Sequence, residues 1–152
     1  MKNYEYVGQQ IGDQKLAINS ESPAQTLNEL YRKLRHAWCR QTAYPACQKE
    51  WVPEDPSYGQ CAITAMIVHD LFGGKIYKLH VDGGGTHYFN VIDGTVVDLG
   101  SEQFTLYHIP VPYENGFEVD PRYCGTNPDT RKRYELLCSR LNLESVSKQQ
   151  LS

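Results

Sequence analysis

The sequence lacks the features that mark several large classes of protein. It has no CxxC pair, which argues against a zinc ribbon and against a thioredoxin-like redox site. No apolar run approaches the ~18 residues of a membrane span, and residues 1–4 do not open an apolar leader. These absences predict a cytoplasmic protein with no membrane partner.

Positive and negative charges are also nearly balanced. The chain has 15 Lys and Arg against 18 Asp and Glu, which gives a net charge of −3. The one basic run, residues 131–133, lies in an expected helix and reads as a solvated face. Without a basic stripe, we expect no nucleic-acid partner.

The five cysteines do not read as a disulfide framework, because their number is odd and their spacing irregular. The 152 residues suit a single domain spanning 1–152. Its core is predicted to cover about residues 24–141. A polar N-terminal arm (1–21) is expected to form a short strand, a hairpin or a loose arm, and a polar tail (142–152) is expected to fray.

Helix signals occur at three places. Ser22 and Pro23 fit the N-cap and first position of a helix that should end near Arg40. A second, mostly apolar helix is predicted from Cys61 to Phe72, before a glycine pair that suits a C-cap. Asn127 fits the N-cap of a last helix.

Strand signals lie between the second and third helices. Residues 75–81, 86–92 and 95–99 read as strands, and Asp93-Gly94 between the last two is a strong hairpin signal. The sequence therefore predicts an α+β fold in which a central helix packs on an antiparallel meander. Residues 41–60 are expected to be a loop, and residues 104–125 an irregular segment rich in Tyr and Pro.

The candidate catalytic cysteine is Cys61, at the start of the central helix. A helix N-terminus presents unpaired N–H groups and partial positive charge, which favour a thiolate. A histidinium at His87 would add a full positive charge. The backbone N–H of Cys61 would lie beside an oxyanion, with the Gln60 side-chain amide as a possible second donor.

Strand geometry predicts that Asp98 orients His87. If Ile92 opposes Thr95 across the hairpin, then Asp98 opposes Phe89 and lies one diagonal step from His87 on the same face. Asn90 competes for this role, but it is expected on the opposite face. A slip of one residue in the register would break this argument.

Each member of the trio also has a structural interpretation. A cysteine in an apolar helix is commonly core, a strand histidine can be satisfied by packing, and Asp98 could cap a turn. A zinc site is conceivable but lacks a local ligand pair, so we expect no metal; its members would be Cys47, Cys61, His87 and Cys124.

An ordered series of motifs between residues 24 and 141 resembles the YunG-like family of small, uncharacterised bacterial proteins. The motifs are Trp38, 51–56, 59–65, 72–74, 87–90, 97–99 and 103–104. More distantly, the order of a Cys-bearing helix, a His-bearing strand and an Asp-bearing strand is similar to papain-like and transglutaminase-like folds. That resemblance implies thiol acyl chemistry carried by Cys61, His87 and Asp98.

Two functions are weighed for this constellation. The first is a thiol hydrolase or acyltransferase acting on an amide or ester of unknown identity, which needs no cofactor. The second is a non-catalytic module that keeps a papain-like shell and binds a peptide or protein. Four residues are candidates for substrate binding: Trp51, Tyr58, Tyr88 and Asn90.

Overall fold

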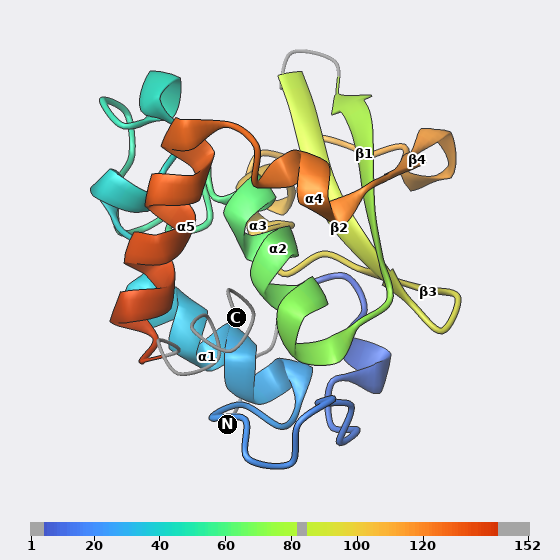
Figure 1. Ribbon diagram of the computed structural model, residues 1–152. Helices are drawn as coiled ribbons and strands as arrows, with labels where there is room; N and C mark the ends of the chain where they lie inside the picture. The colour runs from blue at the N-terminus through green and yellow to red at the C-terminus, as the bar shows by residue number, and fades with distance from the viewer. Residues whose placement is uncertain (1–4, 82–84, 143–152) are drawn as a thin grey trace.

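The computed structural model describes residues 5–81 and 85–142, and Figure 1 shows their arrangement. The expected turn around 82–84 and the tail from 143 onward lie outside the described residues, as do residues 1–4. Along the chain the elements are η1 (Gln9–Ile11), α1 (Leu27–Ala37), η2 (Arg40–Thr42), η3 (Pro45–Cys47), α2 (Cys61–Phe72), β1 (Lys75–Val81), β2 (Gly85–Ile92), β3 (Thr95–Val97), α3 (Glu102–Thr105), η4 (Tyr113–Asn115), β4 (Phe117–Val119), α4 (Pro121–Cys124) and α5 (Pro128–Arg140). None of the described helices has the length and apolar character needed to cross a membrane.

The strands form one antiparallel sheet in the order β3-β2-β1-β4. Ile92 opposes Thr95, as the hairpin signal predicts. Asp93 and Gly94 both have positive φ, 49° and 79°, which a tight two-residue hairpin turn requires. The predicted α+β class and the register of this hairpin are therefore confirmed.

Helix α2 lies in the middle of the molecule, with the sheet on one side and α5 on the other (Figure 1). Its bounds are those predicted from the apolar run. Because both flanks are covered, apolar side chains are needed around most of its circumference. Ile63 and Ile67 are among the largest fully buried residues of the main core.

The two faces of the sheet have different neighbours. Ile76 and Ile92 point to α2 and join the main core. On the opposite face Leu79 and Phe89 pack with Phe104 of α3 in a smaller cluster. This second face carries His87, because residues 87 and 89 share the parity of one strand.

The first helix begins later than Ser22 predicts. Helix α1 starts at Leu27, and the side chain of its N-cap Thr26 accepts a 3.1 Å hydrogen bond from the Glu29 backbone N–H. Thr26 and Glu29 form their own capping signal. Ser22 instead closes a local turn by donating to the Ala24 carbonyl at 2.9 Å.

The segment 104–125 is more regular than its composition suggests. It contains β4, which pairs with the edge strand β1 over residues 117–119, and the short helix α4 beyond it. Three residues are too few to show an alternating pattern, so the strand is formed by its partner rather than by its own sequence.

The N-terminal arm packs more closely than its polar composition indicates. Tyr6 is buried in the main core. Val7 forms an isolated antiparallel bridge with Asp98, whose backbone N–H donates to the Val7 carbonyl at 2.8 Å. The Val7 N–H in turn donates to Ser101 Oγ at 3.1 Å. The arm therefore fixes the chain on either side of Gly100.

Candidate active site

Cys61 is the first residue of α2 and its side chain is partly exposed. Its N-cap, Gln60, provides no side-chain hydrogen bond to the first turn. The N–H groups of this turn are therefore not capped by that side chain. A backbone hydrogen bond from Tyr88 of β2 also reaches the thiol.

His87 lies on β2 with only 1% of its surface exposed. Its Nε2 atom is 2.6 Å from Oδ2 of Asp98. The ring packs edge-on against Phe104, with centroids 4.7 Å apart. Nδ1 has no aligned hydrogen-bond partner among the described residues, so it is the nitrogen left to serve Cys61. Hydrogen bonds of this kind often tighten only when substrate binds.

Asp98 directly follows β3, on the His87 face that the hairpin register predicts. Its Oδ1 accepts a 3.2 Å hydrogen bond from the Gly100 N–H. Its Oδ2 accepts from His87 and also, at 2.6 Å, from the hydroxyl of Tyr113. Both carboxylate oxygens are thus hydrogen-bonded, although Asp98 is buried.

Tyr113 is the member of this network that the sequence did not identify. It begins η4, and its ring packs edge-on against Phe89 with centroids 5.0 Å apart. Burial, and then the Asp98 charge, raise the pKa of Tyr113, so it remains a neutral donor. Its segment is only rich in tyrosines, and that composition does not single out one of them.

The cysteine and histidine change each other's protonation. Burial raises the pKa of the Cys61 thiol, but the neighbouring His87 ring and its positive charge outweigh it, so the pKa is lowered overall. Burial lowers the pKa of His87, but Asp98 and then Cys61 raise it to about 10. The two shifts both act in the direction of a thiolate beside an imidazolium.

Gln60 does not lie where the sequence placed it. Its side chain is fully buried, and its Nε2 donates to the Cys39 carbonyl at 3.0 Å. The amide therefore ties the loop before α2 to the end of α1 and is closed to solvent. The backbone N–H groups of the first turn are better placed to meet a substrate oxygen.

Asn90 is likewise a structural residue rather than one open to substrate. It is 2% exposed, and its Nδ2 donates to the Ala65 carbonyl of α2 at 3.0 Å. Its strand parity directs it toward α2, so it cannot reach the His87 face. The predicted substrate contact at this position is not supported.

The other three candidate substrate residues are half-buried. Trp51 donates through Nε1 to the Pro56 carbonyl at 3.1 Å, a hydrogen bond within the loop itself. Burial, followed by a hydrogen bond with Cys47, raises the pKa of Tyr58 to about 12. Tyr88 is next to the thiol through its backbone.

The sequence of this chain matches a known family. A family model described as YunG protein covers residues 26–145. The chain belongs to the YunG family. One YunG relative, "Uncharacterized protein YunG" from Bacillus subtilis (strain 168), is 40% identical over 88 residues, which cover 55% of this chain and 71% of the relative. No solved structure matches the chain significantly.

The YunG match contains Cys61, His87, Asp98 and Tyr113, whereas Val7 lies before it. Because the relative is itself uncharacterised, it carries no activity over to this chain. Within residues 5–81 and 85–142, no three His, Cys, Asp or Glu side chains gather as a metal site would need. The zinc interpretation of Cys47 and Cys124 therefore gains no support.

Proposed function

We propose that this chain is a thiol hydrolase or acyltransferase that acts on an amide or ester. The observation that carries the proposal is the 2.6 Å contact between His87 and Asp98, together with the mutual effect of Cys61 and His87 on each other's pKa. The lowered pKa of Cys61 and the raised pKa of His87 supply the nucleophile and the acid.

In the first step the Cys61 thiolate attacks the carbonyl carbon of the substrate. A carbon–sulfur bond forms, and the carbonyl π electrons move onto oxygen. As this oxyanion collapses, the bond to the leaving amine or alcohol breaks. His87 donates its proton to the leaving group, and a thioester remains on Cys61.

In the second step water, or an acceptor amine or alcohol, attacks the thioester. Neutral His87 takes the proton of the attacking group, and the carbon–sulfur bond breaks to restore the thiolate beside the imidazolium. Asp98 keeps the imidazole oriented and stabilises its charge through both steps. Hydrolysis and acyl transfer differ only in the identity of the attacking group.

The backbone at the start of α2 is suited to the oxyanion. The N–H groups of the first helical turn have no side-chain cap from Gln60. They also lie at the positive end of the helix dipole. A negative oxygen on the carbon attacked by Cys61 would lie next to these donors.

The order and placement of the trio support a papain-like or transglutaminase-like relationship, with a cysteine at the start of a central helix and a histidine and aspartate from an antiparallel sheet. This is an analogy of architecture, which by itself does not fix an activity. The proposal therefore depends on the chemistry of Cys61 and its partners.

The test is intact-mass analysis after incubation with an activated ester such as p-nitrophenyl acetate. We expect one acetyl group on the wild type, on Cys61, and none on the Cys61→Ser protein. Cys47→Ser is the matched control, because Cys47 is also partly exposed. Equal acetylation of the Cys61→Ser protein would overturn the proposal and leave the binding module as the better interpretation.

A further inference from the structure

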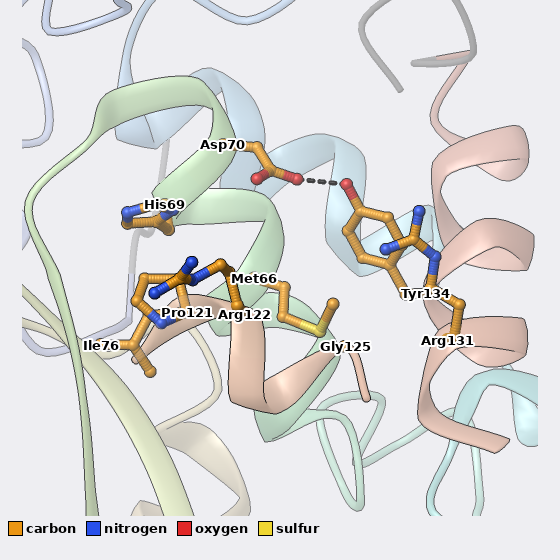
Figure 2. Close-up of a pocket in the computed structure, with 9 residues that line it drawn as sticks. All are labelled: Met66, His69, Asp70, Ile76, Pro121, Arg122, Gly125, Arg131 and Tyr134. Carbon is orange, nitrogen blue, oxygen red and sulfur yellow. Dashed lines mark hydrogen bonds between the residues drawn. The ribbon is translucent and has the colours of Figure 1, made fainter. Parts of the chain in front are cut away.

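A hollow lies away from the proposed triad, between α2, α4, α5 and β1. Its volume is about 330 Å³. Figure 2 shows Met66 in the middle of the lining, with Ile76 and Pro121 to one side and Tyr134 to the other. The hollow is large enough for a small organic molecule and offers it an apolar surface.

The charged groups of this hollow are mostly cationic. Arg122 and Arg131 contribute guanidinium groups from α4 and α5, and His69 lies on the same side as Arg122 (Figure 2). The acidic lining residue, Asp70, already accepts a hydrogen bond from Tyr134. Asp70 keeps its negative charge, so the lining carries two guanidinium charges against one carboxylate.

Both arginines have acidic neighbours, but these do not line the hollow. Arg122 is fully in solvent and contacts Asp120 at 2.9 Å. Arg131 contacts Glu135 through Nε at 3.2 Å, within one helix. Arg122 donates to Asp120 through both Nε and Nη2, at 3.3 Å and 2.9 Å, whereas Arg131 is held only through Nε. A partly exposed single-contact pair such as Arg131–Glu135 is weak and screened by salt, so a ligand carboxylate can compete for the Arg131 guanidinium group.

We propose that this hollow binds a small organic carboxylate whose apolar body packs on Met66 and whose anionic group is held by Arg131, while Arg122 adds positive charge on the other side of Met66 (Figure 2). A planar guanidinium donates two parallel hydrogen bonds to a carboxylate, which gives the site its preference over a neutral group. Met66 is a flexible apolar side chain that can adapt to the body of the ligand.

The site is distinct from Cys61 although both involve α2. Met66 is five positions after Cys61, which places the two side chains about 140° apart around the helix. The carboxylate site therefore does not use the thiol, and its occupancy can be measured in the Cys61→Ser protein. A negative result for the thiol chemistry of Cys61 would not affect the proposed carboxylate site, and a negative result for carboxylate binding would not affect the thiol chemistry.

Gly125 offers a way to close the hollow without removing a charge. A Cβ atom added there would lie 3.4 Å from Arg131 Nη1 and 3.6 Å from Met66 Cε, both ordinary contacts. Gly125 is not among the residues with positive φ, so its backbone accepts a side chain. We expect Gly125→Ala to keep the space and Gly125→Leu to fill it.

The experiment is an NMR titration of the Cys61→Ser protein with phenylacetate, compared with the neutral phenylacetamide. We expect saturable shifts at Met66 and Gly125 with phenylacetate, and affinity at least about fivefold weaker for the amide. Arg131→Gln should weaken phenylacetate binding roughly fivefold to tenfold, whereas Lys132→Gln, on the exposed face of α5, should not change it.

Higher salt should weaken phenylacetate binding, because the attraction is partly between exposed charges. Gly125→Leu should abolish it while Gly125→Ala retains it. Equal binding of the amide, or shifts that survive Gly125→Leu, would overturn the proposal. So would an absence of saturable shifts with phenylacetate in the Cys61→Ser protein.

Discussion

Tyr113 donates a 2.6 Å hydrogen bond to the Asp98 oxygen that His87 also contacts. The hydroxyl spreads the carboxylate charge over two donors, so it limits how strongly Asp98 raises the pKa of His87. Tyr113 is thus a positioning residue that acts on the histidine through the aspartate.

Tyr113→Phe should destabilise the protein and raise the pKa of His87 further. The ring packing on Phe89 is kept, but Asp98 loses a donor while buried, at a cost of about 1–2 kcal/mol in the free energy of unfolding. Urea denaturation measures the stability, and NMR titration of the imidazole nitrogens measures the pKa. A stability loss with no change in titration would mean that the Tyr113 hydroxyl stabilises the fold without acting on His87.

Cys61 should react with iodoacetamide at pH 6 far faster than the other four cysteines. A thiol of ordinary pKa is almost wholly protonated there, whereas the lowered pKa of Cys61 beside His87 leaves a larger fraction of this thiol ionised. Allowing for the lower nucleophilicity of a stabilised thiolate, we expect a rate advantage of roughly tenfold to a hundredfold.

His87→Ala should remove this advantage. Peptide mass mapping of labelled protein at short times measures each cysteine separately, and partly exposed Cys47 is the internal comparison. Equally slow labelling of all five cysteines in the wild type would contradict the ion pair.

The Cys61→Ser protein should lose stability as pH rises above 6.5. In this variant Asp98 still raises the folded pKa of His87 above its ordinary 6.5. The contribution to stability is therefore fully present below pH 6.5 and is lost as pH rises through the folded pKa, with a magnitude on the order of 1–3 kcal/mol.

Thermal or urea denaturation between pH 6 and pH 10 measures this loss. The double variant Cys61→Ser/Asp98→Asn serves as the control, because it lacks the carboxylate that raises the pKa. If both proteins show the same dependence on pH, the Asp98 interaction does not stabilise the imidazolium.

Asn90→Ala should destabilise the protein without changing the reactivity of Cys61. The Asn90 amide joins β2 to α2 through the Ala65 carbonyl, and the loss of this buried hydrogen bond should cost about 1–2 kcal/mol. Thr86→Ala, at an exposed position of the same strand, is the matched control. A change in labelling rate with unchanged stability would restore the earlier assignment of Asn90 to the substrate.

Local patterns were sufficient to predict the central helix and the hairpin. The apolar run from Cys61 ends at a glycine pair, and Asp93-Gly94 fixes which residues face one another. Because strand parity follows from that turn, the side-chain contact between His87 and Asp98 could be predicted before the structure was known.

Long-range packing decided what the sequence could not show. Tyr113 reaches Asp98 only because the segment after α3 returns over Phe89, and no periodic signal marks that path. Gln60 looked like an oxyanion donor because it precedes Cys61. Its amide instead donates a hydrogen bond to the buried side, to the carbonyl of Cys39, which lies 21 positions earlier in the chain.

The backbone hydrogen bond from Asp98 to Val7 joins a residue inside the region matched by the family to one before it, because that region begins at residue 26. The acid of the proposed trio is therefore anchored in part by a segment that relatives need not share. We therefore expect homologues with the same Cys, His and Asp to differ in the pKa of the cysteine where the residues before this region differ. A fragment that begins at residue 26 would lack one of the backbone contacts that hold Asp98.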